Sequence, residues 1–207
     1  MVRAALVPLL LLAGCASPDA SAPGPVAGAP GVSAAARAAE ALPPMLASFR
    51  RSGPVTDFEQ RPGGAGLGAA VPYAPTGGER MAATVFIYDR GRRPPDGDGP
   101  EVAAEFRLAA AELDAAMRAG IYRSVSFANG MGVRSAATAR SFRCANFRIT
   151  QQDGAPTGSS LCVAVQRGMF VKVRLTAWQP PDPGIAGIAA AALTAAVLQA
   201  RDRTTEG

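Results

Sequence analysis

Short runs of apolar and β-branched residues, separated by turn-forming segments, fill the second half of the chain and predict β-strands. Three of these runs span residues 141–149, 161–165 and 170–177. A two-residue loop of Arg167 and Gly168 would join the last two runs as a tight hairpin. Because residues two apart share a face, we expect one apolar face of this hairpin to be core. That face contains Cys162, Ala164, Met169, Val171, Val173 and Leu175. The other face contains Val163, Val165, Phe170, Lys172 and Arg174.

An earlier strand, residues 82–88, is apolar on both faces, which is typical of a strand at the centre of a sheet. A helix is predicted from about Pro100 to Ala119, because apolar residues recur there at helical spacing between a cap at Asp98 or Gly99 and Gly120. We expect its apolar stripe to pack on the sheet. The stripe consists of Val102, Phe106, Ala109, Leu113 and Met117. The charged residues lie mostly off the stripe, at Glu101, Glu105, Glu112 and Arg118.

A second helix is predicted from about Pro183 to Arg203, with Asp182 as its N-cap. Its uncharged span from Gly184 to Ala200 is close to the lower length limit for crossing a membrane. The span is rich in alanine and glycine, however, and these residues give it a poor free energy of transfer into lipid. We therefore interpret it as the closing helix of the domain.

The order of elements is strands from about 45 to 90, a helix, strands from about 122 to 178, and a terminal helix, which indicates an α+β domain. We expect an antiparallel sheet flanked by two main helices. This layout resembles, in topology alone, the α/β sandwich of PsbP, a subunit of the photosystem oxygen-evolving complex. The string Ala83-Thr84-Val85-Phe86-Ile87-Tyr88-Asp89-Arg90-Gly91 also resembles a stretch of uncharacterised small bacterial exported proteins. Neither resemblance implies a chemistry.

The N-terminus has the shape of a signal peptide, in which Arg3 precedes an apolar run from Ala4 to Leu12. The run ends in Leu12-Ala13-Gly14-Cys15, which resembles the lipobox of bacterial lipoproteins. The resemblance implies cleavage between Gly14 and Cys15, diacylglycerol on the Cys15 sulfur and usually acylation of the new amine. Two or three acyl chains would hold the protein at a membrane. The alternative is a plain secretory signal with a chance cysteine.

After Cys15 the composition changes to Ala, Ser, Pro and Gly, which predicts a flexible linker. The chain therefore divides into a signal peptide over residues 1–14, an acylated cysteine and linker over 15–32, and a single domain over 33–207. Ala16 stands where an aspartate would favour inner-membrane retention in proteobacterial lipoproteins. The resemblance thus implies the outer membrane, facing the periplasm. The composition is typical of a GC-rich genome, which also fits bacteria that have no outer membrane.

Cys144 and Cys162 form an isolated pair in a chain that we expect to be exported, and this predicts a disulfide. The midpoint between them is Asp153, inside a turn-rich loop, so an antiparallel hairpin would place the two cysteines opposite each other. A redox-active pair is the alternative. It would lack both the C-x-x-C spacing and a nearby histidine.

The chain contains no histidine, which excludes Ser-His-Asp and Cys-His catalysis and histidine-ligated zinc or haem. We expect no cofactor and no metal. The segment 64–69 satisfies the dinucleotide pattern G-x-G-x-x-G/A, but Val71-Pro72 follows it instead of a helix, so we interpret it as a hairpin tip. The segment 96–101 resembles a calcium loop only faintly, and we interpret it as a turn before the helix.

The formal net charge of +5 is mildly basic. No basic run with interleaved aromatic residues is present, so we expect no nucleic-acid partner. Arg90, Arg92 and Arg93 form a local cluster that could bind phosphate or carboxylate groups of an envelope component. A solvated loop is the alternative interpretation.

Three functions remain open at this stage. We favour a non-catalytic interaction or scaffold module of the cell envelope, held at the membrane through Cys15, with an envelope protein or an anionic envelope component as its partner. A domain that binds lipid or cell-wall fragments would require an apolar pocket between the sheet and the helix at 184–203. An enzyme that acts on glycans with carboxylates alone would require two acidic residues about 5–10 Å apart across one cleft. We expect no enzyme.

Overall fold

The computed structural model describes residues 31–135 and 139–203 of the chain. From Val32 onward they belong to one compact unit. The predicted signal peptide over residues 1–14, the lipobox cysteine Cys15 and the predicted linker as far as residue 30 lie outside the described residues.

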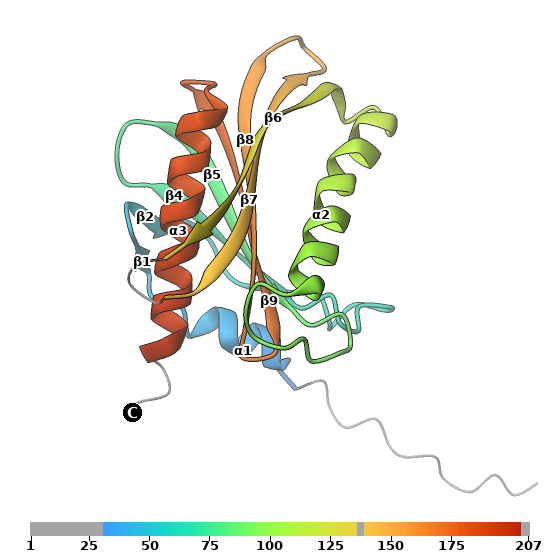
Figure 1. The fold of residues 1–207 in the computed structure, drawn as a ribbon, viewed down its shortest axis with the longest axis vertical. Coiled ribbons are helices and arrows are strands. Elements are labelled where there is room, and N and C mark those ends of the chain that lie inside the picture. The colour runs from blue at the N-terminus through green and yellow to red at the C-terminus, as the bar shows by residue number, and fades with distance from the viewer. Residues whose placement is uncertain (1–30, 136–138, 204–207) are drawn as a thin grey trace, which may run out of the picture. The chain divides into compact units, whose positions relative to one another are not determined.

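An antiparallel sheet forms the centre of this unit (Figure 1). Within the described residues it has nine strands, in the order β1-β2-β4-β5-β9-β8-β7-β6, with β3 paired to β4 off this path. The strands are β1 Met45–Leu46, β2 Phe49–Arg51, β3 Thr56–Asp57, β4 Ala69–Pro75, β5 Arg80–Tyr88, β6 Tyr122–Arg134, β7 Ser141–Gln151, β8 Pro156–Gln166 and β9 Met169–Gln179. The most distant partners in sequence are β5 and β9, which lie side by side although helix α2, Pro100–Arg118, and strands β6, β7 and β8 separate them in the chain.

The hairpin registers agree with those expected from the turn residues. Gln166 pairs with Met169 across the Arg167-Gly168 loop, and Cys162 pairs with Val173. Strands β7 and β8 place Cys144 directly opposite Cys162, and the two cysteines form a disulfide with a Cα–Cα distance of 4.1 Å. The strand predicted at 82–88 lies inside the sheet as part of β5.

Helices cover both faces of the sheet, so the unit has three layers (Figure 1). Helix α2, Pro100–Arg118, lies on one face, and helices α1, Ala34–Glu40, and α3, Pro183–Arg203, lie on the other. The predicted apolar face of the β8–β9 hairpin packs under α3 and is core, as expected. The opposite face is also buried, because α2 covers Val163, Val165 and Phe170.

Helix α1 was not predicted from the sequence. It packs closely on the core because the residues that face the core are alanines. Ser33 caps the helix by accepting a hydrogen bond from the Ala36 amide at 3.0 Å. The same serine donates its amide and its hydroxyl to the carboxylate of Asp57 in β3, both at 3.0 Å. These bonds fix the point at which the chain enters the unit, and buried alanines on α1 pack against the core.

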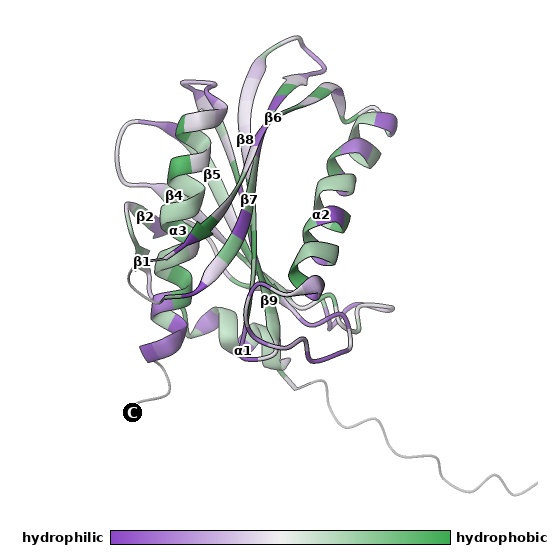
Figure 2. Ribbon diagram, in the orientation of Figure 1, coloured by the Kyte–Doolittle hydropathy of each residue, from purple (hydrophilic) through white to green (hydrophobic). Residues whose placement is uncertain are grey.

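Helix α3 is a core helix, although its length and hydropathy would also suit a membrane span. Half of its most apolar window is buried inside the unit, where Leu193, Val197 and Leu198 are fully enclosed. Asp182 caps it as predicted, since its carboxylate accepts the amides of Gly184 at 2.6 Å and Ile185 at 3.0 Å. Figure 2 shows that the apolar body of α3 ends in a strongly polar last turn.

We expect loss of the Cys144–Cys162 disulfide to lower the free energy of unfolding by about 3 kcal/mol, because the bond restricts the unfolded chain. Urea unfolding of residues 32–207, with and without a thiol reductant, measures this difference. A double variant, Cys144→Ala with Cys162→Ala, is the control on which the reductant should have no effect. An unfolding midpoint of the unmodified chain that does not respond to the reductant would contradict the bond.

Candidate functional site: charged clusters on the two faces of the sheet

A buried carboxylate lies between helix α2 and the sheet. The side chain of Glu105 is fully buried. Its Oε1 accepts a hydrogen bond from the Tyr88 hydroxyl at 2.9 Å and another from Nη2 of Arg90 at 2.8 Å. A buried carboxylate is stable only when it is paired and hydrogen-bonded, and Tyr88 and Arg90 at the end of β5 supply both interactions.

Two further charges extend this arrangement, which we call the Glu105 network. Glu112 is the next carboxylate along α2 after Glu105. Its Oε1 lies 3.7 Å from Nη2 of Arg90, and its Oε2 lies 2.9 Å from Nζ of Lys172. Lys172 is the one lysine of the chain and only 8% of it is exposed. Its ammonium lies 4.8 Å from the centroid of the Phe86 ring, a distance typical of a cation–π contact. The two cations and two carboxylates balance.

The electrostatics of the Glu105 network favour a structural role. Burial, followed by the charge of Glu105 and the hydrogen bond to it, raises the pKa of Tyr88 far above its usual value, so its phenol stays a neutral donor. The hydrogen bond to Glu105 raises the pKa of Arg90. Because Glu105 is sealed from solvent and already bonded, it anchors α2 to the sheet and is poorly placed to exchange protons with a substrate. The hypothesis of a glycan-acting enzyme requires two acidic residues across one cleft. Glu105 and Glu112 both contact Arg90, but only Glu112 is accessible.

The three arginines predicted to bind an anion take separate positions. Arg90 belongs to the Glu105 network, and its backbone has a positive φ of 59°. The guanidinium of Arg92 lies 5.9 Å from the centroid of the Phe170 ring. Arg93 packs over Gly168 in the β8–β9 turn, where a Cβ on the glycine would collide with it. Anion binding by this loop stays a prediction, and Arg92 and Arg93 are exposed and lie outside the Glu105 network.

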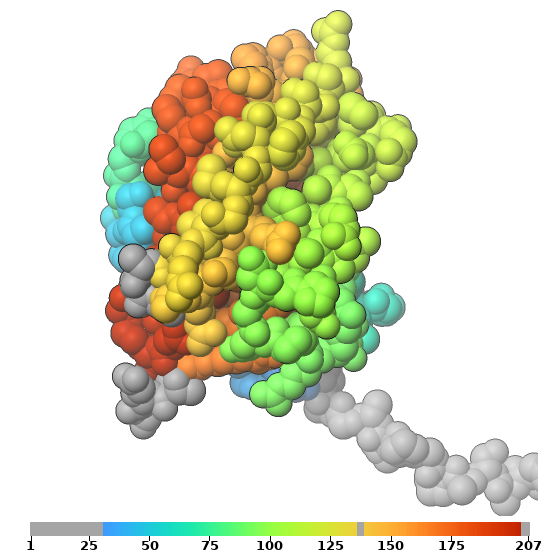
Figure 3. All heavy atoms as spheres, in the orientation of Figure 1, coloured from blue at the N-terminus to red at the C-terminus, as the bar shows by residue number. Residues whose placement is uncertain are grey.

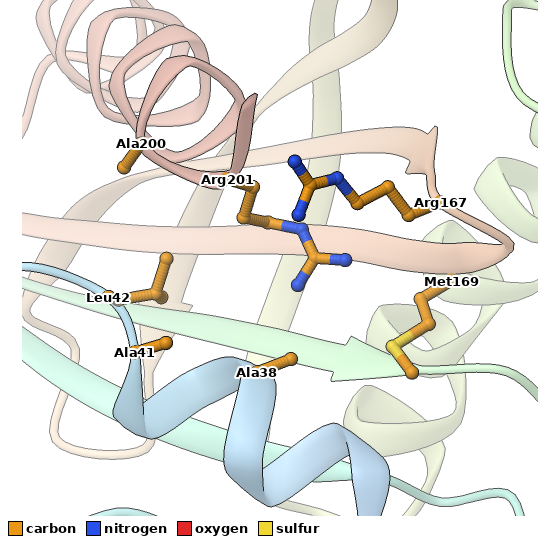
Figure 4. Close-up of a pocket in the computed structure, with 7 residues that line it drawn as sticks. All are labelled: Ala38, Ala41, Leu42, Arg167, Met169, Ala200 and Arg201. Atoms are coloured by element: carbon orange, nitrogen blue, oxygen red, sulfur yellow. The ribbon is translucent and has the colours of Figure 1, made fainter. Parts of the chain in front are cut away.

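A small pocket opens on the opposite face of the sheet, and we call it the arginine pocket (Figure 4). Its volume is about 220 Å³. Helix α1 and the residues after it, the β8–β9 hairpin and the last turn of α3 form its walls. The lining residues are Ala38, Ala41, Leu42, Arg167, Met169, Ala200 and Arg201. Two guanidinium groups thus face a wall that is otherwise apolar.

Arg201 is held in place by the end of strand β8. Only 6% of Arg201 is exposed, and its Nε donates to the side-chain oxygen of Gln166 at 3.1 Å while its Nη2 donates to the Gln166 carbonyl at 3.2 Å. Gln166 is itself fully buried and donates to the Leu198 carbonyl at 2.9 Å and to Asp202 at 2.7 Å. Burial and the nearby charge of Arg167 lower the pKa of Arg201 to about 10.

Arg167 reaches the pocket from a strained position. It has a positive φ of 57° and is followed by Gly168 at 69°, a pair of values that defines a type I′ hairpin turn. A side chain in this conformation costs about 1–2 kcal/mol, which is why Asn or Gly usually occupies the position. Its Nη2 donates to the Asp202 carbonyl at the end of α3 at 3.1 Å. The turn therefore directs a guanidinium onto the C-terminal end of a helix, where a cation is favourable.

Among the residues that the structure describes, the surroundings of the arginine pocket carry more positive than negative charge. Arg140 forms ion pairs with Asp202 at 2.9 Å and with Asp96 at 3.3 Å. The hydrogen bond from Arg140 is the main cause that lowers the pKa of Asp202. Three guanidinium groups, those of Arg140, Arg167 and Arg201, thus face two carboxylates.

The disulfide and the lipobox cysteine stand apart from both clusters. Cys144 and Cys162 are buried in the apolar core on the α3 side, which makes their bond structural. Cys15 lies outside the described residues. Within residues 31–135 and 139–203 no group of three or more Cys, Asp or Glu side chains is arranged to hold a metal ion.

Comparison with known proteins yields distant likenesses. No family model and no curated protein sequence matches the chain. Among solved structures it is similar to cyanobacterial PsbP from Synechocystis sp. PCC 6803, with 12% identity over 72% of this chain and 85% of that chain and a TM-score of 0.44. It is also similar to the Ran-binding protein Mog1p of Saccharomyces cerevisiae, with 8% identity over 77% and 88% and a TM-score of 0.35. Such low values carry no argument about function, and the α+β architecture rests on the sheet and helices themselves.

Sequence reasoning missed Glu105, Arg167 and Arg201. Glu105 lies next to Phe106 of the predicted stripe, and a helical pattern alone does not show that strand β5 ends opposite it with a tyrosine and an arginine. Arg167 had one local signal, since an arginine is unusual at the first position of a type I′ turn. Arg201 had none, because its partner Gln166 is distant in sequence.

We expect Glu105→Gln to lower the free energy of unfolding by about 1–3 kcal/mol, because it removes a buried charged acceptor, while Arg90 is 34% exposed and keeps Glu112 nearby. Asp114→Asn, an exposed change on the same helix, is the matched control and should stay within about 0.5 kcal/mol of the parent. Urea unfolding of residues 32–207 measures both. Equal, small effects of the two variants would show that Glu105 does not anchor α2.

We expect Tyr88→Phe to lower stability at neutral pH by about 1–3 kcal/mol, because it removes a hydrogen bond from the buried carboxylate. The raised pKa of Tyr88 means that the folded chain keeps this proton above pH 10, where the unfolded chain loses it. Its contribution to stability is therefore complete below about pH 10 and declines above it. In Tyr88→Phe this alkaline decline, followed by unfolding midpoints between pH 9 and pH 11, should be shallower by up to about 1.4 kcal/mol per pH unit. A variant with the same alkaline slope as the parent would contradict the assignment.

Proposed function

We propose that this chain is a lipid-anchored, non-catalytic binding module of the bacterial cell envelope. In this proposal the Cys15 sulfur carries the lipid, and the protein faces the periplasm from the outer membrane. The arginine pocket is the surface that meets its partner, an envelope protein or an anionic envelope component.

The observation that carries the proposal is the contrast between the two charged clusters. A cavity of the same volume, about 220 Å³, borders the Glu105 network, but there Glu112 lines it beside the cations Arg90 and Lys172, and the central carboxylate is sealed. In the arginine pocket, two guanidinium groups border a cavity of about 220 Å³ with apolar walls. Ligand sites are usually concave and mostly apolar, with a few fixed polar groups, and the arginine pocket has this composition.

The position of the arginine pocket also bears on the second candidate, a domain that binds lipid or cell-wall fragments. That hypothesis requires an apolar pocket between the sheet and the terminal helix. Met169 of β9 and Ala200 of α3 both line the arginine pocket, so part of its wall meets the requirement. The pocket is too small for a long acyl chain, which favours a compact ligand or a single side chain of a partner.

Loss of the anchor is expected in Cys15→Ser. The parent, extracted from membranes, should have the intact mass of a chain beginning at Cys15 plus two or three acyl chains, whereas Cys15→Ser should lack the lipid and leave the membrane fraction. Ala16→Asp should keep the lipid and shift toward the inner membrane in a proteobacterial host. The control is Cys144→Ala with Cys162→Ala, which should stay acylated. A parent protein that is soluble and carries no lipid would overturn the anchored reading.

A further inference from the structure

We infer that the arginine pocket binds a small carboxylate that carries a short apolar group. The inference deepens the proposed function, because it rests on this pocket being the binding surface and names the chemical class of its ligand. The juxtaposition that supports it is two guanidinium groups, from Arg167 and Arg201, beside a wall of alanine, leucine and methionine side chains.

The charge of the pocket selects an anion. None of its seven lining residues is acidic, and two are arginines. In Figure 4 the guanidinium of Arg201 lies in the space between α3 and α1, and that of Arg167 lies beside it at the end of α3. A planar guanidinium matches a carboxylate with two parallel hydrogen bonds, which an ammonium cannot do. A cationic ligand would meet two like charges at short range and is disfavoured.

The arginines are preorganised, so a ligand would not have to order them. Gln166 holds Arg201 through two hydrogen bonds, and Gln166 is itself fixed by Leu198 and Asp202. The type I′ turn sets the direction of Arg167, and Arg93 packs over that turn. Ordering flexible side chains lowers the affinity of a binding site. In this pocket the fold has already ordered both arginines before a ligand arrives.

The apolar wall and the volume set the size of the ligand. Ala38, Ala41 and Leu42 form one side, and Met169 and Ala200 complete it. At about 30 Å³ per water, a cavity of about 220 Å³ has room for on the order of seven non-hydrogen atoms. Bare phosphate or sulfate would leave the apolar wall without a partner, and a full lipid chain would not fit. A carboxylate with four to six carbons fits both the arginines and the apolar wall of the pocket.

One opposing effect limits the affinity. The pocket lies at the C-terminal end of α3, where the helix carries partial negative charge, and the Asp202 carbonyl already accepts a bond from Arg167. For a ligand of this size we therefore expect a Kd on the order of 1 mM for hexanoate.

The test uses NMR of residues 32–207, the compact unit, carrying ¹³C-methyl methionine. The methyl signal of Met169, assigned with Met169→Leu, reports directly from the pocket wall. Hexanoate is expected to shift this signal in a saturable way. Acetate, 1-hexanol and sulfate should bind at least about tenfold more weakly. Acetate and sulfate lack the apolar group that contacts the wall, and 1-hexanol lacks the carboxylate.

Three variants and a control separate the pocket from general charge effects. Arg167→Gln should weaken hexanoate binding about tenfold or more, and Arg201→Gln should do the same. Because Arg201→Gln could unfold the chain, Ala38→Met provides an independent test that fills the pocket and keeps both charges. It should abolish the Met169 shift. Arg107→Gln removes an exposed arginine from α2 and should leave binding unchanged.

The inference is overturned if Met169 does not respond to hexanoate, if sulfate or 1-hexanol binds equally well, or if Arg107→Gln weakens binding as much as Arg167→Gln. Binding of phosphatidylglycerol vesicles that depends on Arg167 without a hexanoate response would assign the arginines to lipid head groups instead. These outcomes are independent of the Cys15 measurements, so the anchor can stand when the pocket fails, and the pocket can stand when the anchor fails.

Discussion

The burial of the central strands on both faces is the constraint on which the rest of this structure depends. Every residue of β8 from Thr157 to Gln166 is buried, β9 is buried along most of its length, and β5 buries one face and the end of the strand. A sheet of this kind must be covered on both sides, so α2 closes one face while α1 and α3 close the other. The edge strand β6 is mostly exposed. It crosses the surface between α3 and α2 without a helix over it (Figure 3).

Two-sided burial also decides how charges are treated. Polar groups that point from central strands into a helix layer must find partners there, because an unpaired buried charge is costly. On the α2 side, Lys172 and Glu105 are met by Glu112, Tyr88 and Arg90, and the charges cancel. On the α3 side, Gln166 ends β8 and orients Arg201 beside Arg167. A cavity lies beside each arrangement, and the difference is that Glu112 lines the first cavity together with its cations, whereas the seven residues that line the arginine pocket include no carboxylate.

The proposed function follows from combining an anchor with that cavity. A lipid on Cys15 would confine the protein to a membrane surface, and a preformed pocket would then need only modest affinity, because the partner or ligand is concentrated in the same compartment. Helix α1 connects the two ideas: Ser33 fixes the entry of the chain on Asp57, and the same helix contributes Ala38 to the pocket wall.

The sequence by itself determined the elements and contacts that are local. Turn residues and alternation gave the Gln166–Met169 register, the Cys144–Cys162 pairing and the Asp182 cap, because each depends on residues within one hairpin or one helical turn. Helix α1 escaped, since an alanine-rich segment of seven residues has little periodicity. Only the tertiary structure decided that β5 inserts beside β9, that Glu105 meets Tyr88 and Arg90, and that Ala38, Arg167 and Arg201 share one cavity. The physical reason is that these contacts join segments that are far apart in the chain. Their free energy comes from burying whole faces of the sheet, which a local sequence pattern does not indicate.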